Sequence, residues 1–188
     1  VINLYPTERG AGYEFLDKIF GGVIDQPFRP SVDKGIQAKM AEGVVAGYPV
    51  VDCGVELIDG KTHPVDSKDI AFQIAGREVF KKAVMQAGPV LLEPIVNMEV
   101  TVPTRNMGDI TGDVNGRRGR IIGMDSHGDL QTIRCQVPLA EVTNYDAELR
   151  SITGGEGAYT IEFSHYDVVP SNVAQRIIDA AKKADEEE

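Results

Sequence analysis

Residues 59–69, DGKTHPVDSKD, carry a histidine beside a proline where a strand-like segment turns into a helical one. His63 should therefore sit at an exposed corner of the fold, just before a long helix. No cysteine, nucleophile or second histidine at metal-binding spacing accompanies it. Two interpretations stay open for this residue: a solvent-facing turn histidine, or an imidazole that stacks on or hydrogen-bonds to RNA.

A second group of candidate residues lies in NGRRGR, residues 115–120, the densest cluster of positive charge. Arg117, Arg118 and Arg120 could form the solvated end of a helix that Gly119 caps. Their guanidinium groups could equally bind RNA phosphates, because the planar fork suits bidentate contacts. The local sequence alone does not choose between these interpretations.

The sequence lacks the motifs of a phosphate-binding loop and of a metal site. There is no GxxxxGK[ST] phosphate loop, and the glycine-rich run at 154–157 lacks the lysine and leads into a strand. His63, His127 and His165 belong to separate elements, and no CxxC or HxxxH spacing offers a metal site. Cys53 and Cys135 lie in strand-like alternations, which predicts buried free thiols. We expect no catalytic residue, bound cofactor or metal in this chain.

Composition narrows the class of protein further. The 188 residues are 42% hydrophobic and 26% charged, as in an ordinary water-soluble globular protein, and carry a net charge of −10. A charge of that sign argues against indiscriminate nucleic-acid binding, and no apolar run reaches the length of a membrane span. We therefore expect a cytoplasmic protein without a membrane partner. The chain begins with Val1 rather than Met, so we expect it to be part of a longer protein.

The first half is predicted to be β-β-α-β-α. Strands are expected in VINLYP and GYEFLDKIF, followed by a helix from RPSVDKGIQAKMAEG. The next segment, PVVDCGVELIDG, alternates apolar residues on one face: Val51, Cys53, Val55 and Leu57. A long amphipathic helix should then begin with Asp66 as its N-cap and end at Gly88-Pro89.

The second half is predicted to be β-α-β-β-α-β, the order of a ferredoxin-like sandwich. The first strand, IVNMEVTVP, should direct Val96, Met98, Val100 and Val102 inward. Helices are expected near residues 106–115 and 139–153, and a final helix after Pro170. We predict three parts: residues 1–89, residues 90–169, and a C-terminal helix with an acidic tail at 170–188.

Nine stretches of the chain resemble stretches of one protein family and occur in the same order and at the same spacing. They are GGVI, VDKGIQ, AGYPVVD, HPVDSKDIAFQIAG, PVLLEPI, TGDVNGRRG, VPLAEV, ELRSIT and PSNVAQ. Together they resemble the C-terminal part of bacterial elongation factor G, a translation GTPase, or of one of its divergent paralogues. The match covers a truncated fourth domain and the whole fifth domain.

The resemblance implies an α+β protein made of two α/β sandwiches. The first is a left-handed β-α-β domain like that of a small-subunit ribosomal protein, the second is ferredoxin-like, and the C-terminal helix packs back on the first. The full-length protein would bind GTP and Mg²⁺ in an N-terminal domain outside this chain. It would promote GTP-dependent translocation of tRNA and mRNA by inserting the tip of the fourth domain in the ribosomal A site, and we expect it to be monomeric.

The same resemblance implies the site residues. The tip loop corresponds here to His63, Pro64, Asp66 and Ser67, which would meet the tRNA–mRNA region in the small-subunit decoding site. Arg117, Arg118 and Arg120 would contact the large subunit near the stalk base and the sarcin-ricin loop. Three alternatives are kept: a paralogue that acts in ribosome recycling, a small-molecule-sensing ferredoxin-like module, and an oligomerising scaffold.

Overall fold

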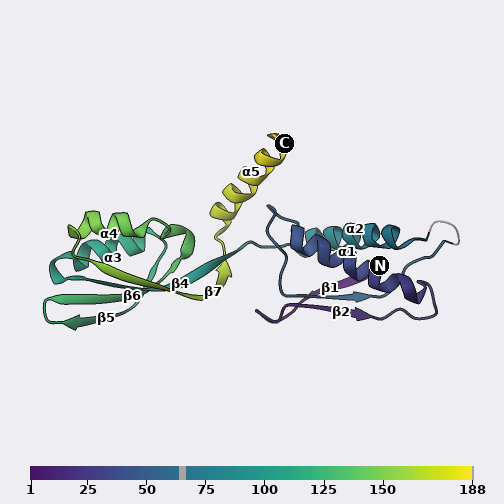
Figure 1. Cartoon of the computed structure of the whole chain (residues 1–188), viewed down its shortest axis with the longest axis horizontal. Coiled ribbons are helices and arrows are strands. Elements are labelled where there is room, and N and C mark those ends of the chain that lie inside the picture. The colour runs from purple at the N-terminus through teal and green to yellow at the C-terminus, as the bar shows by residue number, and fades with distance from the viewer. Residues whose placement is uncertain (64–66, 188) are drawn as a thin grey trace. The chain divides into compact units, whose positions relative to one another are not determined.

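The computed structural model describes residues 1–63 and 67–187 and divides the chain into two units (Figure 1). Unit 1 comprises Val1–Val90 and Ser171–Glu188, and unit 2 comprises Leu91–Pro170. Each unit contains helices, a sheet and a hydrophobic core of its own. The predicted α+β class with two separate sheets is confirmed.

The elements of unit 1 follow the predicted order. They are β1 (Ile2–Pro6), β2 (Tyr13–Asp17), the 3-10 helix η1 (Gln26–Phe28), α1 (Arg29–Glu42), β3 (Cys53–Leu57), α2 (Asp69–Ala87) and α5 (Ser171–Glu187). In the sheet, β3 lies between β1, to which it is antiparallel, and β2, to which it is parallel. The parallel pair needs a crossover connection, and α1 provides it.

The core of unit 1 lies between its sheet and the α1–α2 pair, which covers one sheet face (Figure 1). On β3, the alternate side chains of Cys53, Val55 and Leu57 are buried in this core, as predicted. On α2, Phe72, Phe80 and Val84 are buried, as the helical spacing of its apolar residues predicts, whereas Ala75 and Ala87 of the same predicted stripe are exposed. Gly88 ends this helix in the left-handed conformation, with φ of 71°.

Two glycines allow α1 and α2 to cross closely. A Cβ atom at Gly35 would lie less than 3.0 Å from the backbone oxygen of Gln73, and one at Gly76 would similarly meet the carbonyl of Val32. Backbone therefore contacts backbone at this crossing, and no larger residue fits at either position without moving a helix.

Two strand predictions in unit 1 are wrong at their ends. The segment GYEFLDKIF remains a strand only to Asp17, whose carboxylate then accepts a hydrogen bond from the backbone N–H of Ile19 at 3.0 Å. Val51 does not join the buried alternation and is 55% exposed, because β3 begins only after Asp52, which has φ of 55°. A left-handed residue breaks the period-2 pattern at that point.

Unit 2 has the predicted β-α-β-β-α-β order. Its elements are β4 (Leu92–Pro103), η2 (Thr104–Asn106), α3 (Met107–Gly116), β5 (Arg120–His127), β6 (Leu130–Pro138), η3 (Leu139–Glu141), α4 (Tyr145–Thr153) and β7 (Ala158–Val168). The strands form an antiparallel sheet in the order β5-β6-β4-β7. The helix predicted over 139–153 is divided: a 3-10 turn precedes α4, which begins only at Tyr145.

The core of unit 2 fills the space between its sheet and α3 and α4, which lie over one sheet face (Figure 1). The four β4 residues predicted to point inward, Val96, Met98, Val100 and Val102, are all at most 3% exposed. Cys135 is buried beside them on β6 and donates from Sγ to the backbone oxygen of Met98 at 3.5 Å. The alternation in the sequence therefore located this core correctly.

The C-terminal helix α5 is grouped with unit 1, but none of its side chains from 171 to 184 is buried. Its partly exposed residues recur at helical spacing: Val173, Ala174, Ile177, Ile178 and Ala181. Within residues 1–63 and 67–187, no helix combines the length and apolar character that crossing a membrane requires.

Candidate nucleic-acid interface

Two loops leave the same end of the unit 1 sheet. Strands β2 and β3 are parallel, and Asp17 at the end of β2 pairs in register with Leu57 at the end of β3. The backbone N–H of Lys18 extends this pairing with a 2.9 Å hydrogen bond to the oxygen of Leu57. The loops that follow, residues 18–25 and 58–63, therefore emerge side by side; we call this sheet end the β2–β3 tip.

The two loops of the β2–β3 tip are held together by packing and by hydrogen bonds from an arginine side chain. A Cβ atom at Gly60 would overlap the side chain of Ile24, which is 3% exposed, so the absence of a side chain lets the two loops touch. Arg29 donates from Nε to the oxygen of Ile24 at 3.1 Å and from its guanidinium to Asp17 at 2.8 Å. The bond from Arg29 is the main cause of the lowered pKa of the Asp17 carboxyl. These contacts make a firm base for the loops.

His63 lies on the β2–β3 tip and is exposed, as the sequence predicted. Its backbone N–H donates to the hydroxyl of Ser67 at 2.7 Å, and the N–H of Ser67 donates back to the oxygen of His63 at 3.1 Å. These reciprocal bonds join the backbone of His63 to Ser67, just before α2. Pro64 and Asp66, which were also predicted as site residues, lie outside the described residues.

The start of α2 differs from the prediction. The helix begins at Asp69, and Lys68 occupies the N-cap position without a side-chain cap. Asp66, the predicted N-cap, lies outside the described residues, as noted above. The carboxylate of Asp69 lies in the first turn, where the helix dipole favours a negative charge, and accepts a 2.9 Å bond from Ser31 Oγ on α1. A contact with α1 therefore fixes the beginning of α2.

A pocket of about 220 Å³ opens beside His63. The described residues that line it are Lys61, His63, Ser67, Ala71, Phe72 and Ala75, the last three from the first turns of α2. Phe72 is 9% exposed and stacks on Phe28, with ring centroids 4.7 Å apart and planes 10° apart. The apolar side of the pocket is therefore preformed.

Phe20 is a residue of the β2–β3 tip that the sequence analysis missed. Its side chain is 93% exposed, the largest value among the exposed large apolar residues of the described chain. It directly precedes Gly21 and Gly22, which have φ of 76° and 72°. The sequence did contain a signal for this exposed position, because an aromatic residue precedes a glycine pair at the end of a strand. The residue types of this segment also fit a continuing strand.

Arg117 is held in the fold of unit 2. Its guanidinium donates to Asp113 at 2.9 Å and to the backbone oxygen of Glu141 at 2.5 Å, and it forms an ion pair with Glu148. It also lies 5.2 Å from the centre of the Tyr145 ring. The hydrogen bond to Asp113 is the main cause of the raised pKa of this guanidinium. The group joins α3 to η3 and α4.

Arg118 is held in the same way, by different carboxylates. Both oxygens of Glu93 accept from its guanidinium, at 2.6 and 2.9 Å, and Glu141 accepts from Nε at 2.9 Å. The bond to Glu93 is the main cause of its raised pKa. Its φ of 60° is a conformation that costs a non-glycine residue about 1 kcal/mol, so the ion pairs must offset backbone strain.

Arg120 differs from its two neighbours. Its residue is exposed on β5, and its guanidinium donates to a neutral group, the side-chain oxygen of Gln136, at 2.9 Å. The structure therefore separates the three arginines: Arg117 and Arg118 are paired with carboxylates, whereas Arg120 presents a positive charge to solvent. The grouping in the sequence offered no sign of this division.

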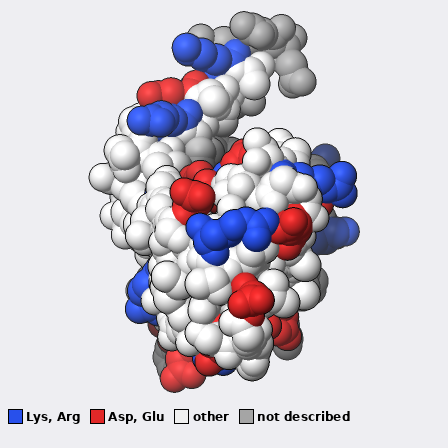
Figure 2. Space-filling view, turned by 90° about the vertical axis from the view of Figure 1, so that its left-hand side faces the viewer, with Lys and Arg blue, Asp and Glu red and all other residues white. Residues whose placement is uncertain are grey.

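On one face of the molecule, the charge is mixed rather than concentrated (Figure 2). On the face in Figure 2, basic and acidic side chains are interspersed and form no continuous basic field. Several described pairs are oppositely charged neighbours, such as Arg134 with Asp125 at 2.9 Å and Arg150 with Asp146 at 3.0 Å. On this face, nucleic-acid contacts would therefore have to be local, since a broad electrostatic attraction is absent there.

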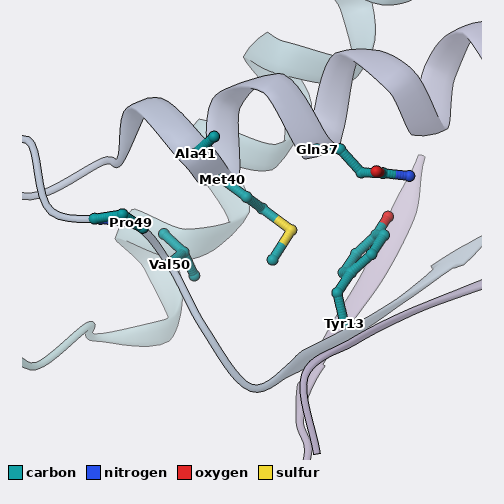
Figure 3. Close-up of a pocket in the computed structure, with 6 residues that line it drawn as sticks. All are labelled: Tyr13, Gln37, Met40, Ala41, Pro49 and Val50. Atoms are coloured by element: carbon teal, nitrogen blue, oxygen red, sulfur yellow. The ribbon is translucent and has the colours of Figure 1, made fainter.

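A second pocket of the same size, about 220 Å³, lies in unit 1 between β2, α1 and the segment before β3 (Figure 3). It is lined by Tyr13, Gln37, Met40, Ala41, Pro49 and Val50, mostly apolar groups. The hydroxyl of Tyr13 donates to Asp33 at 2.7 Å. No lysine, arginine or histidine is among these lining residues, in contrast to the pocket beside His63. Among the described residues, no group of three or more His, Cys, Asp or Glu side chains could hold a metal ion.

The two α+β domains of this chain match family models of the translation elongation factors. Residues 1–88 match the family model for elongation factor G, domain IV, and residues 90–177 match the model for the elongation factor G C-terminus. The chain belongs to the elongation factor G family and corresponds to the C-terminal part of such a factor.

Individual relatives agree with this assignment. The chain is 51% identical over 178 residues to elongation factor G of Aquifex pyrophilus, covering 95% of the chain and 26% of that protein. A crystal structure of a protein from Thermus thermophilus superimposes with a TM-score of 0.81 at 43% identity, covering 97% of the chain and 27% of that structure. The chain thus spans about a quarter of the length of these relatives.

Proposed function

We propose that this chain is the ribosome-contacting arm of an elongation factor G-type GTPase. In the full-length protein, GTP and Mg²⁺ would bind in a domain outside this chain, and hydrolysis would drive movement of tRNA and mRNA. Unit 1 would enter the decoding site of the small subunit with the β2–β3 tip foremost. Unit 2 would contact the large subunit near the stalk base and the sarcin-ricin loop. The whole protein is expected to act as a cytoplasmic monomer.

The observation that carries this proposal is the construction of the β2–β3 tip. An exposed imidazole and a nearly fully exposed phenyl ring extend from loops whose bases are tied by Gly60, Ile24 and Arg29. RNA is recognised largely by stacking bases on aromatic rings and by hydrogen bonds to unpaired edges. Rings on a fixed base can do this without a large positive field.

The tip residues have distinct proposed roles. His63 supplies the ring, Ser67 makes two hydrogen bonds with the His63 backbone, and Pro64 and Asp66 belong to the same proposed contact. On unit 2, Arg120 is the best supported phosphate ligand because its charge is exposed. A phosphate role for Arg117 and Arg118 stays a prediction, and it would require them to exchange carboxylate partners for phosphates.

The small-molecule-sensing alternative concerns the ferredoxin-like unit 2, whereas the two pockets described above lie in unit 1 and give it no support. A role in ribosome recycling would use the same surfaces and differs only in what the full-length protein does on the ribosome.

The test is the substitution His63→Ala in the full-length protein. Translocation of tRNA and mRNA, followed by rapid kinetics, should slow by roughly 5- to 150-fold, because a ring that contacts RNA is worth roughly 1–3 kcal/mol. Ribosome-stimulated GTP hydrolysis should stay close to that of the wild type. Tyr48→Ala, at an exposed aromatic beyond the opposite end of β3, is the matched control and should change neither rate. If hydrolysis falls as far as translocation, the proposed role of the tip is wrong.

A further inference from the structure

We propose that the pocket beside His63 binds a single unpaired nucleotide of RNA, with the base on its apolar side and a phosphate at Lys61. This inference rests on the proposed function, because it names what the β2–β3 tip would hold. It concerns residues of α2 and of the segment before the turn that were not predicted as site residues. We call this cavity the tip pocket.

The tip pocket has two chemically different sides. Ala71, Phe72 and Ala75 line it from α2 and offer apolar surface, while Lys61, His63 and Ser67 line it from the segment before α2 and offer polar groups. A nucleotide has the same division, since a flat base with apolar faces is joined to an anionic phosphate. Bases stack favourably on aromatic side chains, and an ammonium group suits a phosphate as a point charge.

The size of the tip pocket limits the ligand. A volume of about 220 Å³ accommodates one ring system rather than a whole cofactor. The equally large pocket of Figure 3 has an apolar lining without a cation, so volume alone does not make a nucleotide site. The combination of Lys61 with the apolar side distinguishes the tip pocket.

The apolar side of the tip pocket is set before any ligand arrives. Phe72 is stacked on Phe28, so its ring is not free to collapse into the space. Ala71 and Ala75 belong to α2, whose first turn is tied to α1 through the bond between Ser31 and Asp69. A preformed site lowers the entropy cost of binding.

The experiment is a titration of the isotopically labelled 188-residue chain with adenosine monophosphate, followed by amide chemical shifts. We expect shifts at Lys61, Ser67, Ala71 and Ala75 that saturate together. Ala75→Leu should fill the pocket and weaken binding by at least about tenfold, and it should not disturb the helix because leucine is a good helix former. Ala41→Leu fills the pocket of Figure 3 in the same way and should leave binding unchanged.

Two further binding measurements separate the role of the base from that of the phosphate. Inorganic phosphate at equal concentration should bind at least about tenfold more weakly than the nucleotide, because it lacks the base that stacks. With a single-stranded RNA tetranucleotide, Lys61→Met should weaken binding and reduce its salt dependence by the share of one phosphate, about 0.7 in the logarithmic slope. Three results would each overturn the proposal. Ala75→Leu could leave the nucleotide affinity unchanged, Ala75→Leu and Ala41→Leu could weaken nucleotide binding equally, or phosphate could bind as tightly as the nucleotide.

A protein ligand is the competing occupant, and the same titration detects it. If an acidic aromatic peptide, Glu-Phe-Glu-Phe, saturates these amides at lower concentration than the nucleotide, the pocket is a peptide site and the proposal is wrong. The pocket proposal and the proposed function can fail independently. If His63→Ala slows translocation but the tip pocket binds no nucleotide, only the pocket proposal is wrong. If the tip pocket binds a nucleotide but His63→Ala leaves translocation unchanged, only the proposed role of the tip is wrong.

Discussion

The guanidinium of Arg118 donates to both carboxylate oxygens of Glu93, at 2.6 and 2.9 Å. Glu93 lies near the start of β4, and Arg118 lies in the turn between α3 and β5, so the pair joins segments 25 residues apart. The side chains are 27% and 12% exposed, for Arg118 and Glu93 respectively, which shields the ion pair from much of the solvent. The contact is therefore part of what holds unit 2 together.

We predict that Glu93→Gln destabilises unit 2 by about 1–3 kcal/mol, because Arg118 then loses a charge-assisted partner in a partly buried position. Arg118→Lys should have a similar effect, since an ammonium group cannot make the bidentate contact. The measurement is urea-induced unfolding followed by circular dichroism. Glu99→Gln, at an exposed position of the same strand, is the control and should change stability by less than about 0.5 kcal/mol. Equal effects in both glutamine variants would refute the structural role of the pair.

The close crossing of α1 and α2 leads to a second prediction. Gly35→Ala should destabilise unit 1 by more than about 2 kcal/mol, although alanine is the better helix former, because its Cβ would clash with the backbone of Gln73. Gly112→Ala in α3 has no atom within 4 Å of the added Cβ and should instead stabilise unit 2 by about 0.5–1 kcal/mol. Thermal or urea unfolding of both variants tests the opposite signs. Stabilisation by Gly35→Ala would mean that the helices do not cross at this glycine.

Much of the fold was predictable because it depends on local periodicity. The alternation of Val96, Met98, Val100 and Val102 identified a strand with one buried face, and the structure buries all four. The end of α2 at Gly88 was equally visible, since only a residue tolerant of positive φ suits that position. In these segments the chemical pattern and the structural repeat coincide.

The remaining features depend on partners distant in the sequence. Nothing near Arg118 indicates that Glu93 will take its charge, so the arginine cluster was interpreted as one group although two members are paired internally. Phe20 follows strand-like residues, and only the loop held by Ile24 and Gly60 leaves it exposed. For His63 the exposed corner was predicted, but the tip pocket beside it was not, because its walls come from two elements.

A pH dependence follows from the buried thiol of Cys135. Burial raises its pKa from 9.0 to about 11, so between these values the unfolded chain ionises while the folded chain stays neutral. The unfolded state then binds fewer protons, and the free energy of unfolding should fall as pH rises through this window, by at most about 1.4 kcal/mol per pH unit. Below pH 9.0 the contribution is fully present.

Comparison with Cys135→Val isolates this thiol, because the raised pKa values of Tyr145 and other groups act in both proteins. Urea unfolding of unit 2 at about pH 8, 9, 10 and 10.5 should show a steeper decline for the wild type than for the variant. Two parallel curves would show that Cys135 ionises equally in the folded and unfolded chains, contrary to its burial.

The exposure of Phe20 yields a prediction that separates binding from stability. Its ring is 93% exposed, so Phe20→Ala removes almost no buried surface, and the stability of the chain should change by less than about 0.5 kcal/mol. If the ring stacks on an RNA base at the ribosome, its loss should remove about 1–3 kcal/mol of binding, a weakening of roughly 5- to 150-fold.

The binding measurement uses the full-length protein with purified ribosomes and a non-hydrolysable GTP analogue, and the stability measurement uses the 188-residue chain. Tyr48→Ala is again the matched variant, because Tyr48 is a 57% exposed aromatic in the segment that leads into β3 rather than on the β2–β3 tip. It should leave ribosome affinity unchanged. If the two variants weaken binding equally, an exposed ring matters wherever it lies and the tip has no special role; if neither does, Phe20 does not contact RNA.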